Sequence, residues 1–269
     1  MRAGSRLGVV SWNLDHWQGT EQRRAEAWRY LDDTLAQELD WDVALLQECM
    51  PPSGRPDVVF RPVRGGPWGT AVVTRGAAVR PLDLEEDSLP GCLVAAEVDL
   101  GDRGEVTVVS LYGLNEFRKS VSEETSAYRY TITSVHRLLS DLTPLIDLRG
   151  RVRSPRPLVV AGDLNVSTQL DPPDRERHAN VLERFASLGL TDAWEVSPDK
   201  VPADDCVCAD APGCGHVRTH THRNSAKPWQ DDYLFVNRRL RVVSCRTVVD
   251  EHTWERSDHA PVAAILEAP

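Results

Sequence analysis

Short apolar segments recur along the whole chain and are separated by charged, glycine-bearing or proline-bearing segments. Apolar runs of about four to eight residues that are rich in valine and leucine are typical of partly buried strands. Runs of this character lie at 7–13, 42–47, 58–60, 69–74, 92–98, 106–111, 158–161, 232–236, 240–245 and 261–266. This pattern predicts a protein with many strands.

Helical spacing is found in three other places, where apolar residues recur at steps of three and four positions. Thr20 and Ser122 are candidate N-caps for the first two helices, and Gly189 is a candidate stop signal for the third. The apolar positions are Trp28, Leu31, Leu35 and Leu39, then Val135, Leu138, Leu142 and Leu145, and finally Val181, Leu182, Phe185 and Leu188. We therefore expect helices inserted among the strands.

The order of these elements favours an α/β sandwich of two sheets with outer helices, because strands and helices alternate too irregularly for a doubly wound sheet. The length of 269 residues suits one large domain, and we find no linker and no short-period repeat that would divide the chain. We expect a single domain over residues 1–269, with an irregular loop at about 199–218 that holds three of the six cysteines.

The charge balance limits the partners that we expect. Lysine and arginine number 31 against 41 aspartates and glutamates, which gives a net charge of −10. Such a chain does not attract a phosphate backbone as a whole, although a local basic rim can still meet a nucleic acid or a small phosphate ester. No run approaches the ~18 apolar residues of a membrane span, and no secretory leader pattern opens the chain, so we expect no membrane insertion and a cytoplasmic location. No segment indicates an obligate protein partner.

Polar side chains stand at the ends of several of the predicted strands, where a buried strand normally avoids charge. Residues two positions apart face the same side of an extended chain. One such carboxylate is usually a turn residue, but five strand ends with this feature indicate clustered oxygen ligands, which a hard cation such as Mg²⁺ or Mn²⁺ needs. The residues are Asn13, Asp15, Glu48, Asp163, Asn165, Asp232, Asp258 and His259.

The motifs that contain these residues resemble, in order, the motif set of the endonuclease/exonuclease/phosphatase (DNase I-like) superfamily. They are Trp-Asn-Leu-Asp (12–15), Leu-Gln-Glu (46–48), Gly-Asp-Leu-Asn-Val (162–166), Asp-Tyr (232–233) and Ser-Asp-His (257–259). This family includes DNase I-like nucleases, AP endonucleases, neutral sphingomyelinases and inositol polyphosphate 5-phosphatases. The resemblance implies a four-layer α/β sandwich in which helices flank two central mixed or antiparallel sheets.

The resemblance also implies a metal site. Glu48 matches the principal ligand of a divalent cation, Mg²⁺ or Mn²⁺, and Asn13 matches its companion in the metal site. Asp258 and Asp15 match acidic positions near the metal. Asp163 matches the group that orients or deprotonates the attacking water.

The remaining catalytic roles concern the phosphate. By resemblance, Asn165 matches a donor to the scissile phosphate, and His259 matches a phosphate-binding or proton-transferring histidine that Asp232 orients. Tyr112 and Asn115 resemble the Tyr-x-x-Asn pair that reaches the phosphate in AP endonucleases. Donors of this kind, preorganised around phosphoryl oxygens, stabilise the charge that develops during hydrolysis.

Two further residues are candidates for substrate contact. Trp17 follows the first motif closely and either lines the substrate pocket or packs on the helix after Thr20. His220 and His222 alternate with threonines in 219–223 and so share one face, which indicates either a strand face that lines the site or a solvated strand; His222 is taken as the candidate for substrate contact. After Glu48 the chain continues with Cys49, where AP endonucleases usually have threonine, so the resemblance to that branch is incomplete.

The loop at about 199–218 contains a separate group of candidate ligands. Cys206, Cys208, Cys214 and His216 lie within eleven positions and could form a small tetrahedral Zn²⁺ site of structural type. Free thiols on a loop, or a disulfide in an exported protein, are the alternatives.

Together, the motifs predict a metal-dependent hydrolase of phosphodiester bonds, with in-line attack by a water that Asp163 activates. A nuclease is the first expectation. A phosphodiesterase or phosphatase acting on small molecules or lipids, such as inositol phosphates or sphingomyelin, is the second. A catalytically silent binding module that keeps the fold is the alternative from another class, although none of the core motif positions is lost.

Overall fold

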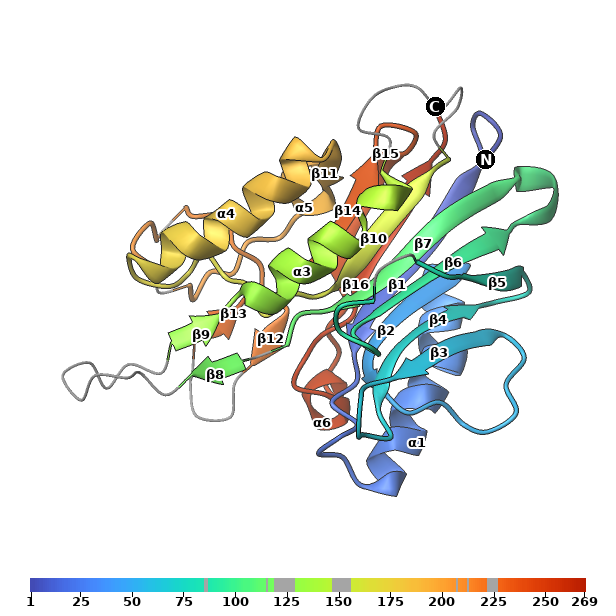
Figure 1. Cartoon of the computed structure of the whole chain (residues 1–269), viewed down its shortest axis with the longest axis horizontal. Coiled ribbons are helices and arrows are strands. Elements are labelled where there is room, and N and C mark those ends of the chain that lie inside the picture. Colours follow the sequence, from blue (N-terminus) through green and yellow to red (C-terminus); the bar gives the residue numbers. More distant parts are fainter. Residues whose placement is uncertain are drawn as a thin grey trace.

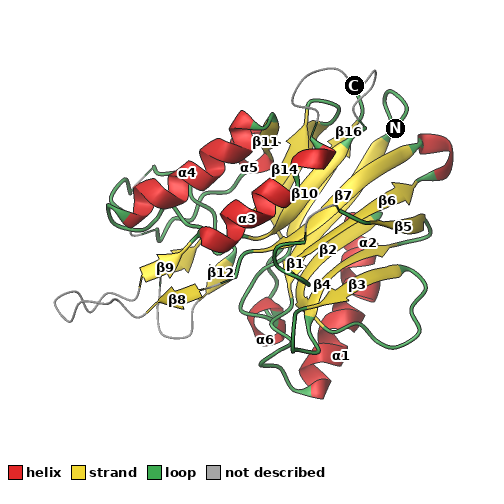
Figure 2. Cartoon of the chain, in the orientation of Figure 1, coloured by secondary structure: helices red, strands yellow, loops and turns green. Residues whose placement is uncertain are grey.

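The strand-like segments form two six-stranded sheets that pack face to face, with helices on their outer sides (Figure 1). Figure 2 shows the same layers, with the strands at the centre. The computed structural model describes residues 1–84, 87–114, 116–118, 129–146, 156–206, 208–211, 213–221 and 227–269. The predicted α/β sandwich is confirmed, and both of its large sheets are mixed.

The first sheet brings the two ends of the chain together. Its strands are β1 (Arg6–Asn13), β2 (Val43–Cys49), β3 (Val58–Pro62), β4 (Gly69–Thr74), β15 (Arg241–Thr247) and β16 (Val262–Glu267). They are hydrogen-bonded in the order β15–β16–β1–β2–β4–β3. β1 and β2 run parallel, and the other neighbours are antiparallel.

The second sheet has the same design. Its strands are β5 (Ala78–Leu82), β6 (Leu93–Asp99), β7 (Glu105–Tyr112), β10 (Leu158–Asp163), β11 (Leu190–Asp192) and β14 (Asp232–Asn237), in the order β11–β14–β10–β7–β6–β5. β7 and β10 are its parallel pair. Two small sheets join β8 (Glu116–Arg118) to β9 (Arg129–Thr131), and β12 (His220–Thr221) to β13 (Pro228–Trp229).

The helices fall where the spacing of apolar residues predicts them, with short additions. They are α1 (Glu21–Arg29), a π-helical segment (Tyr30–Leu35), α2 (Ala36–Leu39), α3 (Thr133–Asp141), α4 (Asp174–Ser187), α5 (Ala193–Val196) and α6 (Thr253–Arg256). Two 3-10 turns lie at Gly101–Arg103 and Thr143–Leu145. None of the helices in the described residues has the length and apolar character that a membrane crossing requires.

Two of the three predicted helix boundaries are confirmed. The Thr20 hydroxyl accepts a hydrogen bond from the backbone N–H of Arg23 at 3.2 Å, as an N-cap does. Gly189 follows α4 with a φ of +77°, a conformation that glycine adopts without strain. The prediction of Ser122 as a cap is wrong, because β9 intervenes and α3 begins only at Thr133.

The apolar positions of β2 alternate between two cores. Val43 and Leu45 join a core between the sheets that extends beneath α3 and α4, whereas Ala44 and Leu46 join a core beneath α1. Both faces of the central strands are thus covered, as is usual for parallel pairs. The buried carboxylates of these strands, Glu48 and Asp163, lie near their carboxyl ends, and that edge carries the candidate site.

A half-buried carboxylate outside that edge gives a test of the packing. Asp192 ends β11 and caps α5 by accepting the Trp194 N–H at 2.9 Å. Burial raises the pKa of Asp192 to about 7. The folded chain therefore holds this proton at pH values where the unfolded chain has lost it, and stability falls as pH rises from about 4 to about 7.

We expect Asp192→Asn, which keeps the capping oxygen but carries no charge, to raise Tm by roughly 2–4 °C at pH 8 and to change Tm little at pH 4. Thermal unfolding followed by circular dichroism at both pH values measures this. Asp83, whose side chain is 95% exposed, supplies the control Asp83→Asn, which should leave Tm nearly unchanged at both. An equal effect of Asp192→Asn at the two pH values would contradict the assignment.

Candidate active site

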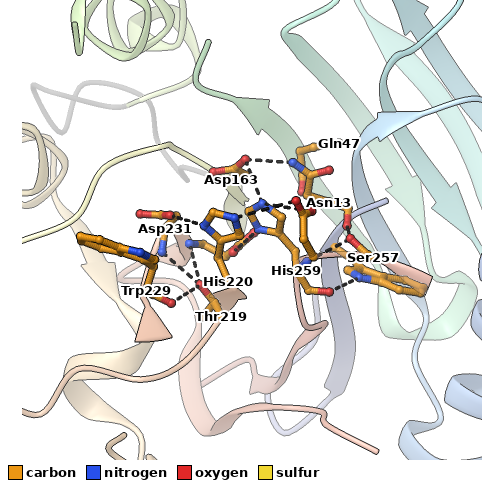
Figure 3. Close-up of polar contacts among 12 residues, drawn as sticks. Asn13, Gln47, Asp163, Thr219, His220, Trp229, Asp231, Ser257 and His259 are labelled. Atoms are coloured by element: carbon orange, nitrogen blue, oxygen red, sulfur yellow. Dashed lines mark hydrogen bonds and ion pairs between the residues drawn. The ribbon is translucent and has the colours of Figure 1, made fainter. Parts of the chain in front are cut away.

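Side chains from both sheets meet where the carboxyl ends of β1, β2, β7 and β10 lie together (Figure 3). The Asn13 amide nitrogen, at the end of β1, donates to Asp163 Oδ2, at the end of β10, at 2.9 Å. The Tyr112 hydroxyl, at the end of β7, is hydrogen-bonded to Glu48 on β2. Two cross-sheet contacts therefore tie together the strand ends that the sequence motifs mark.

Asp163 is held by several donors. Its Oδ1 accepts the backbone N–H of Asn165 at 2.8 Å, and its Oδ2 accepts the Asn165 side-chain amide at 3.1 Å. The Gly162 that precedes it allows β10 to approach β7, because a Cβ there would meet the Leu111 carbonyl oxygen at 1.8 Å. The carboxylate is 1% exposed, so its orientation is fixed by these contacts.

His259 faces two carboxylates. Its Nδ1 lies 2.8 Å from Asp232 Oδ2, and its Nε2 lies 3.7 Å from Asp163 Oδ2. Burial alone would lower the pKa of His259, but the charges of Asp232 and Asp163 and the hydrogen bond to Asp232 raise it well above the usual value. The imidazole is therefore held in its charged form, which suits contact with an anion.

The pKa of Asp163 is raised as well. Burial is the largest cause, the nearby imidazolium of His259 acts in the opposite direction, and the Asp232 charge raises the pKa further. A carboxylate with a raised pKa is a stronger base than an exposed one, which suits it to accept a proton.

A β-bulge directs Glu48 into this site. The register between β2 and β4 shifts between Leu46 and Cys49, and Glu48 has a φ of +47°. Gln47 donates to Ser110 Oγ on β7 at 2.9 Å, and Glu48 contacts Tyr112 on the same strand. Two successive side chains thus face β7, which regular strand alternation does not permit.

The surroundings of Glu48 fit a divalent cation. The residue is 7% exposed, and its hydrogen bonds come from two neutral groups, the Tyr112 hydroxyl and the Asn13 amide. Burial raises the pKa of Glu48 to about 7, although those hydrogen bonds and the nearby His259 act in the opposite direction. A hard cation would offset the cost of burying this carboxylate, and the available donors are the oxygens that such a cation prefers.

Asn13 and Asp15 lie beside Glu48. Asn13 Oδ1 accepts the backbone N–H of Asp15 at 2.9 Å, so its amide nitrogen is the atom that faces Asp163. The Asp15 carboxylate pairs with Arg23 at 2.9 Å, and its charge contributes to raising the pKa of Glu48. The roles of both residues as ligands stay predictions.

Three residues of the site have left-handed backbone conformations that side chains other than glycine rarely adopt. The φ angles are +49° for Asp15, +47° for Glu48 and +50° for Asn165. Such conformations cost of order 1–3 kcal/mol each and cluster at functional sites, where the surrounding structure holds them. Each of the three stands directly after, or at the end of, a central strand.

Hydroxyl side chains connect the motifs that are far apart in sequence. Ser257 Oγ donates to the Asn13 carbonyl oxygen at 2.6 Å and accepts the His259 N–H at 3.0 Å. Thr219 Oγ1 accepts the N–H groups of Asp231 and Asp232 at 3.0 and 3.2 Å. Figure 3 shows Ser257 beside His259 and Thr219 beside His220.

Sequence reasoning missed a second histidine–aspartate pair. His220 Nδ1 lies 2.8 Å from Asp231 Oδ2, and its ring stacks on that of His259 with the centroids 4.3 Å apart (Figure 3). Asp258 lies near both rings, with its Oδ2 4.0 Å from His220 Nε2 and its Oδ1 4.0 Å from His259 Nε2. The alternation of histidine and threonine in 219–223 predicted that His220 and His222 share a strand face, but it gave no signal for the contact of His220 with Asp231.

Three further predicted substrate contacts stay untested. Asn115 and His222 lie outside the described residues. Trp17 is 53% exposed, so α1, the helix on which it was a candidate to pack, does not cover the whole side chain. Its role in substrate binding stays a prediction.

The family assignment agrees with this geometry. Residues 10–259 match the profile of the Endonuclease/Exonuclease/phosphatase family, and the chain therefore belongs to that family. It is a family of phosphoesterases whose members generally use divalent metals. Among curated proteins, no match was found.

Several solved structures share the fold. An endonuclease/exonuclease/phosphatase from Beutenbergia cavernae is 18% identical, with a TM-score of 0.61 over 99% of this chain and 72% of that one. The AP endonuclease of Leishmania major is 17% identical, with a TM-score of 0.65 over 98% and 88%. D. rerio TDP2, solved with a single-strand DNA product, is 18% identical, with a TM-score of 0.59 over 98% and 100%.

The contacts of His259 lead to a measurable expectation. Asp232→Asn removes the charge that contributes most to raising the pKa of His259, so this pKa should fall. Titration of the imidazole by NMR, with the signal assigned through His259→Ala, measures it. Asp231→Asn is the matched control, because Asp231 contacts His220 and not His259. If the two variants shifted the His259 pKa alike, the pairing with Asp232 would not be its cause.

Proposed function

We propose that this protein is a divalent-metal-dependent hydrolase of phosphodiester bonds and that it acts as a nuclease. The observation that carries the proposal is one buried group of contacts. Asp163 faces the charged His259 on one side and receives the Asn13 amide on the other, and Asn13 also contacts Glu48. This group combines a candidate base (Asp163), an imidazolium that can bind an anion (His259) and a candidate metal ligand (Glu48).

The cation would lie beside Glu48, with Asp258, Asp15 and Asn13 as the further candidate ligands by resemblance. When bound, it would position the phosphate and stabilise negative charge on the phosphoryl oxygens. Magnesium or manganese suits these oxygen donors.

The residues of the chain would divide the remaining chemistry. Asp163 orients a water for in-line attack and accepts its proton. His259, kept charged by Asp232, donates a hydrogen bond from Nε2 to a phosphoryl oxygen. The Tyr112 hydroxyl, which contacts Glu48, and the Asn165 amide, which donates to Asp163 and to the Gly113 carbonyl oxygen, are by resemblance the further candidate donors that would turn to the phosphate when substrate binds.

Two observations bear on the substrate. The solved structures that share the fold include an AP endonuclease and a TDP2 with a DNA product, which supports nucleic acid. The net charge of −10 favours the second candidate, a smaller phosphodiester or phosphomonoester, because a duplex would meet a negative surface.

A hydrolysis panel tests the proposal. We expect the protein to cleave a phosphodiester substrate with Mg²⁺ or Mn²⁺ and to lose this activity when a chelator is added. The panel compares single- and double-stranded DNA, RNA, an abasic duplex, a phosphodiester dye substrate and phosphorylated inositols. Activity on monoesters alone would favour a phosphatase, and inactivity on every substrate with either metal would favour a binding module.

Variants of the two central residues give the matching control. Asp163→Asn and His259→Ala should each lower turnover at least about a hundredfold on the best substrate, the usual contribution of one acid or base group. His136→Ala is the control, because His136 lies on α3 and contacts Arg184 of α4 in the outer layer. Near-normal turnover of either site variant, with its fold intact by circular dichroism, would remove that residue from the mechanism.

The role of Glu48 predicts a different kinetic effect. Glu48→Gln keeps the size and the hydrogen-bonding oxygen of the side chain but removes the charge that would bind the cation. We expect the metal concentration for half-maximal rate to rise roughly tenfold or more. Glu183→Gln, at an exposed position of α4, is the control. An unchanged metal dependence would place the cation elsewhere.

A further inference from the structure

Four soft ligands meet in the loop that follows α5, apart from the oxygen-rich site. The ligand atoms of Cys206, Cys208, Cys214 and His216 all lie within 4.8 Å of one another. Cys206 Sγ and His216 Nδ1 are 3.7 Å apart. Tetrahedral zinc, with Zn–S near 2.3 Å and Zn–N near 2.1 Å, separates a sulfur ligand from a nitrogen ligand by about 3.6 Å. The cluster therefore has the dimensions of a zinc site.

The imidazole of His216 is oriented for coordination. Its Nε2 lies 2.8 Å from the hydroxyl of Thr168, which can accept the proton of that nitrogen. In this tautomer the lone pair of Nδ1 points toward the cysteines. A hydrogen bond from the distal nitrogen to a fixed acceptor is the usual way in which proteins orient a metal-binding histidine.

Donor groups of the chain also lie close to the sulfurs of the cluster. The backbone N–H groups of Cys208 and His216 lie near the sulfurs of Cys206 and Cys214, respectively. The side-chain amide of Gln169 donates to Cys206 Sγ at 3.3 Å. Donors aimed at sulfur stabilise thiolates, and the thiolate is the form that binds a metal. A loop with unrelated free thiols needs no such set of donors.

We propose that Cys206, Cys208, Cys214 and His216 bind one Zn²⁺ ion in a structural site. Four protein ligands complete a tetrahedron, so the site has no open position for substrate or water. Sulfur and nitrogen donors also distinguish it from the Glu48 site, whose donors are oxygens. Cys206, Cys208 and His216 are each 8% exposed, which shields the ion from solvent.

The zinc site would connect three segments that surround the candidate active site. Thr168 and Gln169 follow the Gly-Asp-Leu-Asn motif, and they contact His216 and Cys206. Gln169 also donates to the Pro228 carbonyl oxygen at 2.6 Å, at the start of β13. The ion would thereby hold the hairpin of β12 and β13, which leads into Asp231 and Asp232, against the end of β10.

Metal analysis of the intact protein tests this. Protein purified under reducing conditions without added metal should contain about one zinc per chain. Cys214→Ser and His216→Ala should lose most of it, whereas Cys92→Ala, which removes a buried thiol at the start of β6, should retain it. Glu48→Gln should also retain it, which separates this ion from one bound in the active site.

A second measurement does not depend on the variants folding. Cobalt(II) exchanged into the wild-type protein should give the visible and near-ultraviolet absorption of tetrahedral thiolate coordination, and Cys214→Ser should weaken it. The proposal is overturned if the reduced wild-type protein contains no zinc and binds cobalt without thiolate absorption. It is equally overturned if mass spectrometry finds two of these cysteines joined in a disulfide in the purified protein.

Discussion

The hydrogen bond from Asn13 to Asp163 is the interaction on which the site depends, because it joins the end of β1 in one sheet to the end of β10 in the other. Glu48, Asp163 and Asp232 are 7%, 1% and 0% exposed. Burying a carboxylate without a partner costs several kcal/mol, which is comparable to the net free energy of unfolding of many whole proteins. The two sheets therefore cannot shift against each other at this edge without leaving a charge unpaired, and the packing of the cores and the geometry of the site support each other.

Backbone geometry brings the charges to that edge. Parallel pairs at the centre of each sheet end on the same side, and the antiparallel strands β14 and β16 begin there, so motifs from residue 13 to residue 259 meet in one place. The bulge in β2 turns Glu48 toward β7, and Asp15 and Asn165 turn in left-handed conformations directly after their strands. This local strain has a physical reason. If the strands continued regularly, alternate side chains, including polar ones, would point into the apolar cores.

Much of this arrangement could be predicted from the sequence, for physical reasons that also mark the limits of such a prediction. The strands β1, β2, β7 and β10 are buried on both faces, so they appear as continuous apolar runs, and the polar residues at their ends stand out. The edge strand β5 carries Arg80 and Pro81 and is mostly exposed, so its sequence has no such signal. His220 lies in a strand of two residues whose position depends on Thr219 and on tertiary contacts, and no periodicity could have paired it with Asp231.

The two candidate metal centres differ in a way that explains why both can exist in one small protein. The candidate active site offers carboxylate and amide oxygens at strand ends. These donors suit a hard cation that exchanges with solvent and can bind the substrate. The Cys/His cluster offers three sulfurs and one nitrogen on a loop with little regular structure, where a tightly held soft ion can replace the missing hydrogen-bonded framework. That loop contacts Thr168 and Gln169, which follow Asp163, and Gln169 reaches the β12–β13 pair that precedes Asp232. The zinc ion would thus hold the loop in place, and direct hydrogen bonds would connect that loop to the residues that position His259. The cation beside Glu48 would take part in the chemistry.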